Sequence, residues 1–143
     1  MPVMATIRVT TAAALAGVDR RTVRRWLGEG EIDLAALLQK ADLRLSAEEA
    51  QTALQADAGS ADACAELATL FAERGFHSRA VEWWQQAAER NHADAMHWLA
   101  RAYLDGRGVA PDLNLGLMWL AKSASIGHPI SKAQTRALLS RSL

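Results

Sequence analysis

The sequence has few cysteines, few prolines and no excess of either charge. Its one cysteine, Cys64, excludes a disulfide within the chain and favours a reducing compartment. The 16 basic and 16 acidic residues cancel, so the whole chain has no general attraction for nucleic acid or a membrane surface. No apolar run approaches the roughly 20 residues that cross a bilayer, and the run 12–16 is too short for a signal-peptide core. We therefore expect a cytoplasmic protein without membrane contact.

The abundant residues favour helices. Half of the chain is apolar, Leu and Ala dominate, and only three prolines interrupt it. β-Branched residues are scarce beyond about position 25, which removes the usual signal for strands. The length suits one compact domain, or a small domain packed on a short array. The composition therefore predicts an all-α fold.

The stretch 93–127 predicts a helical hairpin. Apolar residues fall at helical spacing in both halves, so each half has one face to bury. Between the halves, Gly106 and Gly108 tolerate a positive φ at the end of a helix. Pro111 cannot continue a helix, and Asp112 is a good residue to begin the next one.

The same pattern occurs immediately upstream. Residues 61–73 align with 93–105 at an offset of 32, and beyond the turn the offset becomes 36, which pairs Trp83 with Trp119. A hairpin of this size cannot bury its apolar face alone, and therefore stacks on its neighbour. The tandem copies predict a short helical solenoid.

The downstream copy carries a specific string of residues. It consists of Ala93-x-Ala95, Leu99-Ala100, Tyr103, Gly106-x-Gly108-Val109, Asp112, Trp119 and Gly127. This string resembles the Sel1-like repeat, a relative of the tetratricopeptide repeat. The upstream copy departs from it at the turn, where it has Glu73-Arg74-Gly75-Phe76. The resemblance implies a scaffold that binds other proteins, often in bacterial regulation, secretion or envelope biology.

The resemblance also implies a binding surface, because the first helices of such hairpins line the concave side of the array. Packing as in the family turns Trp98, Leu99 and Ala102 inward, together with Tyr103. Four positions in each copy are then left facing a groove: Asp62, Ala65, Thr69, Ala72, Asp94, His97, Arg101 and Leu104. The alternative is that two repeats give too little curvature for a groove.

The first 32 residues predict a helix-turn-helix segment. Thr11 can cap a helix over 12–16, Gly17 turns the chain, and Asp19 caps a second helix over 20–27. Four arginines crowd one side of the second helix, namely Arg20, Arg21, Arg24 and Arg25. Guanidinium groups in this arrangement suit contacts to phosphate and guanine. Over about 24 residues the segment resembles the N-terminal helix-turn-helix of MerR-type regulators and phage excisionases.

The arginine face has a second interpretation. An arginine-rich helix face is often simply solvated, and Glu29, Glu31 and Asp33 follow the arginines closely and would repel a phosphate backbone on that side. Asp33 also caps a further helix, which leaves no support for the wing of a winged domain. We therefore expect DNA as the alternative partner and a protein as the leading one.

The residues between the two ends predict a helical connector and N-terminal cap. Ser46 and Glu49 form a capping box. From residue 29 to 66 nine acidic residues face two basic ones, a distribution that either lets the two ends of the chain contact each other or marks a solvated face. We divide the chain into a helix-turn-helix-like segment 1–32, a connector 33–59 and an array 60–143 with a capping helix from about 129.

Patterns typical of catalysis or metal binding are weak. His92 and His97 are five residues apart, so they point to different sides of a helix and cannot hold one metal together. His77 and His128 lie in predicted turns without a neighbouring carboxylate or cysteine. The sequence has no nucleophile elbow and no Gly-rich phosphate loop. We expect a non-enzymatic protein without cofactor or metal.

Three functions follow from these patterns. The first is a cytoplasmic adaptor or regulatory scaffold that holds a protein partner on the repeat array. The second is a small transcriptional regulator whose arginine helix binds DNA, with the repeats used for dimerisation or sensing. The third is a homo-oligomer in which repeat ends stack chain on chain.

Overall fold

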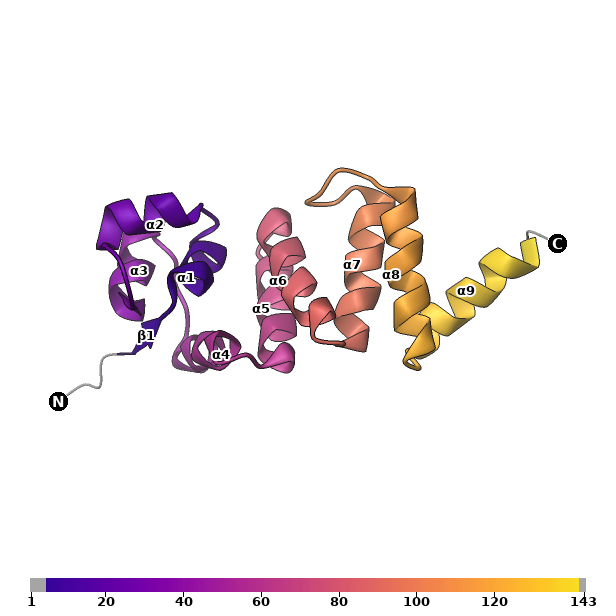
Figure 1. Cartoon of the computed structure of the whole chain (residues 1–143), viewed down its shortest axis with the longest axis horizontal. Helices are drawn as coiled ribbons and strands as arrows, with labels where there is room; N and C mark the ends of the chain where they lie inside the picture. The colour runs from indigo at the N-terminus through magenta and orange to yellow at the C-terminus, as the bar shows by residue number, and fades with distance from the viewer. Residues whose placement is uncertain (1–4, 142–143) are drawn as a thin grey trace.

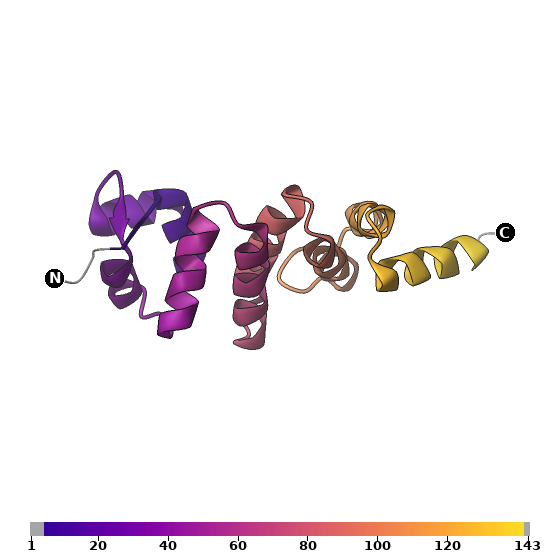
Figure 2. The ribbon, with the colours of Figure 1, turned by 90° about the horizontal axis from the view of Figure 1, so that it is seen from below.

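The computed structural model describes residues 5–141, and the all-α prediction is confirmed. Nine helices lie within this range: those of residues 9–40 cluster at one end, and the later ones follow one another along a long axis to the yellow C-terminal end (Figure 1). The order along the axis is unchanged when the molecule is turned by 90° (Figure 2). The chain is therefore an elongated row of helices.

The N-terminal unit contains three short helices and one pair of very short strands. Its elements are β1 (Thr6–Ile7), α1 (Val9–Ala16), α2 (Arg20–Leu27), β2 (Ile32–Asp33) and α3 (Leu34–Lys40). The strands pair antiparallel, with Ile7 opposite Ile32. The Thr22 amide donates to Asp19 Oδ1 at 2.7 Å, so the predicted cap of α2 is confirmed. β2 leads directly into α3, as expected for a segment without a wing.

Two predicted caps in this unit are wrong. Helix α1 begins at Val9, before Thr11, and its N-cap residue Arg8 makes no side-chain capping bond. Thr11 is buried and its hydroxyl instead donates to Asp57 at 2.6 Å, because α4 lies close enough to offer a carboxylate. Asp33 is the N-cap residue of α3, but its side chain forms no capping bond.

The rest of the chain is α4 followed by two hairpins and a terminal helix. These elements are α4 (Ala47–Asp57), α5 (Ala61–Glu73), α6 (His77–Glu89), α7 (Ala93–Asp105), α8 (Leu113–Ser125) and α9 (Pro129–Arg141). The capping box of Ser46 and Glu49 begins α4, and Gly106 ends α7 in the left-handed region. Both features are as predicted.

The buried residues form two adjoining clusters. The first extends from the N-terminal unit through α5 and α6 and includes Leu15, Phe71 and Trp83, each with at most 1% of its surface exposed. The second lies among α6, α7 and α8 and includes Leu99 and Trp119. Leu99, Ala102 and Trp119 of the predicted apolar faces hold the two hairpins together, whereas Trp98 and Leu117 of those faces are exposed.

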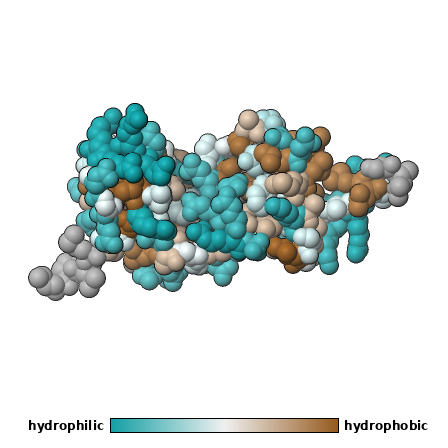
Figure 3. Space-filling model, viewed as in Figure 1, coloured by the Kyte–Doolittle hydropathy of each residue, from teal (hydrophilic) through white to brown (hydrophobic). Residues whose placement is uncertain are grey.

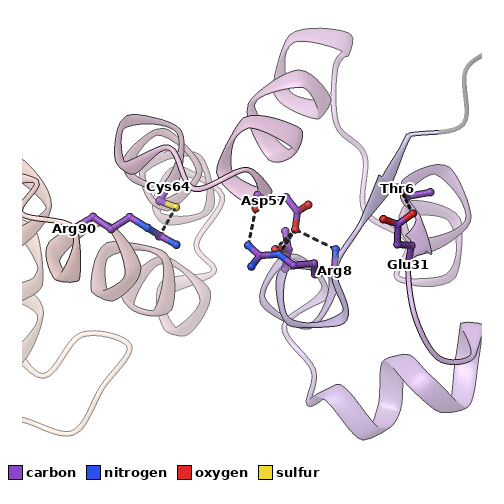
Figure 4. Close-up of polar contacts among 7 residues, drawn as sticks. Thr6, Arg8, Glu31, Asp57, Cys64 and Arg90 are labelled. Atoms are coloured by element: carbon purple, nitrogen blue, oxygen red, sulfur yellow. Dashed lines mark hydrogen bonds and ion pairs between the residues drawn. The ribbon is translucent and has the colours of Figure 1, made fainter.

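The N-terminal unit is fixed to the array by hydrogen bonds as well as by packing. The Trp83 indole N–H donates to the Ala14 carbonyl at 3.2 Å. The Arg8 backbone N–H and guanidinium both donate to Asp57 Oδ1 at 3.1 Å, as Figure 4 shows. Burial alone would raise the pKa of Asp57, but the hydrogen bonds from Thr11 and Arg8 outweigh it and hold the pKa below its ordinary value.

The glycine turn of the second hairpin packs tightly on the first hairpin. Gly108 has φ +76, and a Cβ atom at this residue would lie 2.4 Å from the carbonyl carbon of His77 at the start of α6. Only glycine permits this close approach of two backbones. The corresponding turn of the first hairpin contains Gly75, where a Cβ would meet nothing within 4 Å.

Candidate protein-binding groove

A groove crosses the exposed faces of α5 and α7. It consists of two adjoining hollows of about 610 Å³ and about 360 Å³. Thr69, Glu73, Trp84 and Trp98 line both hollows and make them continuous. Helix α4 closes one side of the larger hollow through Glu48, and the turn after α7 borders the smaller one.

Two stacked indole rings lie at the junction of the hollows. The rings of Trp84 and Trp98 are 6.2 Å apart and inclined by only 18°. Trp98 is 47% exposed, so part of its ring is open to a ligand. Its edge rests on the buried ring of His97 at 5.3 Å. An exposed, well-supported tryptophan in a concave surface is typical of protein-binding sites.

Six of the eight residues predicted to face the groove do line it. They are Asp62, Ala65, Thr69, Ala72, Asp94 and Arg101. Leu104 is wrong as a groove residue, because it turns toward α8, where its side chain occupies the space beside Gly116. His97 is also wrong, because it is only 2% exposed and packs beneath α9.

Trp98, predicted to point inward, lies instead in the groove. The exposed stripe of α7 runs through Asp94, Trp98, Arg101 and Asp105, and therefore differs in phase from the predicted stripe at two of its four positions. Helix α7 packs against α6 and α8 through Leu99, which leaves Trp98 exposed at the edge of that face, whereas α9 covers His97. Ser131 of α9 is the residue that meets His97 there.

The matching stripe on α5 contains two carboxylates that sequence reasoning missed. Residues 62, 66, 69 and 73 are exposed and correspond to the α7 stripe at the offset of 32. Glu66 and Glu73 therefore line the groove. The sequence contained the signal, since polar residues at these four positions alternate with the buried residues Leu67 and Phe71.

A buried hydrogen-bond chain anchors α9 under the groove. The Ser131 hydroxyl donates to Ser123 Oγ at 2.9 Å, and Ser123 donates to the Ala93 carbonyl at 2.9 Å. Ser131 Oγ therefore accepts from His97 Nδ1 at 3.0 Å, which places the proton of His97 on this nitrogen. The rings of His97 and His128 stack with centroids 4.7 Å apart.

Both ring nitrogens of His128 also have partners within the protein. Its Nδ1 accepts the Ser131 backbone N–H at 3.2 Å, so the proton lies on Nε2, which faces Asp94 Oδ1 at 2.7 Å. Ser131 is fully buried. Although serine, histidine and aspartate meet here, the hydroxyl is closed to a substrate and already bonded within the core, so the cluster has a structural role.

The four arginines of α2 lie on the surface, away from the groove. Arg20, Arg21, Arg24 and Arg25 are all exposed, whereas Val23 on the opposite side of the helix is fully buried. Arg24 forms an exposed ion pair with Glu29 at 3.5 Å. Figure 3 shows strongly hydrophilic residues gathered over this end of the molecule.

Within residues 5–141 no group of three or more His, Cys, Asp or Glu side chains is arranged to hold a metal ion. In the same range no helix has the length and apolar character needed to cross a membrane. Cys64 is fully buried, and burial raises the pKa of its thiol. It lies on α5, and Figure 4 shows the hydrogen bond that Arg90 donates to its sulfur.

Two packed hairpins with a shared groove and a terminal capping helix define a helical-repeat scaffold. Residues 61–92 and 93–128 each match the Sel1 repeat, so the repeat part of the prediction is confirmed. The crystal structure of a Sel1 repeat protein from Oxalobacter formigenes has the same fold, with a TM-score of 0.59 and 24% identity over 90% of each chain. No curated protein matches the chain. None of these comparisons shows the predicted likeness of the N-terminal segment to MerR-type regulators.

Proposed function

We propose that this protein is a non-enzymatic adaptor that holds a protein partner in the groove between α5 and α7. The observation that carries the proposal is the half-exposed indole of Trp98, stacked on Trp84 in the middle of the groove. Sel1 repeats serve protein–protein interaction, which agrees with this use of the surface. A ring held on one face and open on the other loses little conformational freedom when it binds.

The same structure supports a role without catalysis. The buried histidines are committed to the docking of α9, and the free thiol of Cys64 is buried with a raised pKa. A thiol in that state is a poor nucleophile. A reduced cysteine in the core also agrees with a cytoplasmic location, which we retain as part of the proposal.

The adaptor function is tested by capture from a nuclease-treated cell lysate. The wild type is compared with Trp98→Ala, which removes the exposed ring, and with Leu113→Ala, an exposed residue of α8 outside the groove. We expect a specific protein to be retained by the wild type and the Leu113 variant and lost with Trp98→Ala. Retention by all three proteins would refute the groove as the binding surface. His97→Ala is unsuitable here, because it would disturb the buried chain that anchors α9.

DNA binding by α2 is a second candidate function. Its support is the exposure of all four arginines on a short helix whose other side is packed in the core. Binding of this kind falls steeply as salt rises, because each phosphate contact releases a counterion. We expect Arg24→Ala to lower the slope of log affinity against log salt by about one unit. Fluorescence anisotropy with duplex DNA measures this slope, and salt-independent binding would refute the candidate.

Self-association through the end of the array is the third function to be tested. Ile130 and Leu139 of α9 are 54% and 62% exposed, which gives the last helix apolar surface beyond its own packing. Such a surface is suited to stacking on another repeat. Light scattering over a range of protein concentrations tests it, and a constant monomer mass would refute it.

A further inference from the structure

The groove concentrates negative charge, although the chain as a whole has no net charge. Six carboxylates line the larger hollow: Glu48, Glu49, Asp62, Glu66, Glu73 and Asp94. The one basic side chain lining that hollow within residues 5–141 is His92, which pairs with Asp62 at 3.1 Å. A concave surface lined by one sign of charge raises the local concentration of ligands of the opposite sign.

Several of these carboxylates have little to neutralise them. Among the described residues, Glu48 and Glu73 form no side-chain hydrogen bond or ion pair, and Glu66 receives only a long hydrogen bond from Thr52 at 3.4 Å. Glu49, by contrast, pairs with Arg74 at 3.3 Å. The groove therefore holds acceptors that a cationic ligand can still use.

The open face of Trp98 adds a second way to bind a cation. A guanidinium or ammonium group is attracted to the face of an indole ring, and the other face of Trp98 is already covered by Trp84. Glu66 lines the larger hollow together with Trp98, and Glu73 lines both hollows. A cation placed on Trp98 would therefore have carboxylates within the same groove.

The smaller hollow differs in character. Its lining includes the small apolar side chains Ala72 and Ala102 beside the two tryptophans. Its arginine Arg101 pairs with Asp105 at 3.7 Å, so the two charges offset each other. This end of the groove suits an apolar side chain, while the larger hollow suits cations.

We propose that the groove binds a basic segment of a partner protein, in which Lys or Arg side chains occupy the acidic hollow and Trp98, and an apolar side chain enters the hollow beside Ala72 and Ala102. This inference rests on the proposed adaptor function and adds the chemistry of the partner. The charge of the groove disfavours nucleic acid and acidic peptides by the same electrostatics.

The test uses two synthetic peptides with the same leucines, one carrying arginines and the other carrying glutamates at the same positions. Isothermal titration calorimetry measures the affinity of the full chain for each peptide at low and high salt. We expect the arginine peptide to bind, more weakly as salt rises, and the glutamate peptide not to bind. Absence of binding by the arginine peptide, or equal binding of both peptides, would overturn the inference.

Substitutions in the protein test whether the arginine peptide binds in the groove. The double variant Glu66→Gln with Glu73→Gln should weaken binding of the arginine peptide about fivefold, as for exposed charge pairs. Trp98→Ala should weaken it about tenfold. The control is Glu31→Gln with Glu89→Gln, which removes the same charge from exposed positions outside the groove and should change affinity less than about twofold. An equal effect of the control and groove double variants would overturn the inference.

Two further outcomes separate this inference from the adaptor function and from self-association. If the glutamate peptide binds and Trp98→Ala abolishes that binding, the basic partner is wrong while the groove is still a protein-binding site. If the chain forms oligomers that dissociate when Arg20, Arg21, Arg24 and Arg25 are changed to alanine, the occupant is α2 of a second copy, and a separate basic partner is refuted. Light scattering with and without the arginine peptide measures this outcome.

Discussion

The glycine turn that joins α7 and α8 offers the sharpest test of how the two repeats are held together. A methyl group added at Gly108 would overlap the backbone of α6 at His77 and Ser78, at 2.4 to 2.8 Å. Backbone atoms at the start of a helix cannot move aside as a flexible side chain can. The variant Gly108→Ala therefore has to move the turn between α7 and α8 away from the first hairpin.

The size of the effect can be divided into two parts. A residue with a side chain costs about 1–2 kcal/mol in the left-handed region that Gly108 occupies, and forced overlap in a packed region costs about a further 1–3 kcal/mol. We expect Gly108→Ala to lower the free energy of unfolding by about 2–5 kcal/mol. Gly75→Ala is the matched control, because Gly75 has φ +82 but open space around it. Gly75→Ala should lower the free energy of unfolding only by the cost of the left-handed conformation, about 1–2 kcal/mol.

Urea denaturation followed by circular dichroism measures both variants against the wild type. The difference between Gly108→Ala and Gly75→Ala isolates the close approach of the turn to α6, since the two glycines have similar φ angles. Equal losses of stability in the two variants would refute the reasoning, because the contact between the turn and α6 would then contribute nothing.

Three further predictions concern titratable groups. Burial, and after it the neighbouring His128 ring, lowers the pKa of His97. The neutral form of His97 therefore stabilises the fold fully above about pH 6.5, and this stabilisation is lost as the pH falls through the pKa of the folded state. In thermal melts taken at successive pH values, His97→Gln should make that loss smaller. The lowered pKa of Asp57 acts at lower pH, so its contribution to the free energy of unfolding is present above about pH 4 and is lost below it. Asp57→Asn should lower the free energy of unfolding by about 1–3 kcal/mol near neutral pH, because it weakens the hydrogen bonds from Thr11 and Arg8. An unchanged urea midpoint would contradict this. The raised pKa of the Cys64 thiol predicts that a thiol reagent modifies it only after unfolding, and rapid modification of the folded protein would show that the residue is accessible.

The sequence predicted most of the groove because helical spacing and the repeat offset place the first helices side by side. It failed at His97, which residues of α9 cover, and at Trp98, which the packing of α7 on α6 and α8 leaves exposed. Asp94 was placed correctly in the groove, yet its bond to His128 joins residues 34 positions apart and has no local signal. The acidic character of the site was missed at Glu66 and Glu73, whose exposed spacing on α5 could have shown it, and at Glu48, which α4 contributes from outside the repeats.

Local sequence by itself determined the caps of α2 and α4, the glycine end of α7 and how the hairpins repeat, because caps, left-handed turns and apolar spacing act over a few residues. Tertiary structure decided which side chains are available to a partner. Contacts from α9 buried His97, packing of α7 against α6 and α8 left Trp98 exposed, and docking of the N-terminal unit on α4 and α6 turned Thr11 into a partner of Asp57. Those outcomes depend on contacts between distant elements, which helical periodicity does not encode.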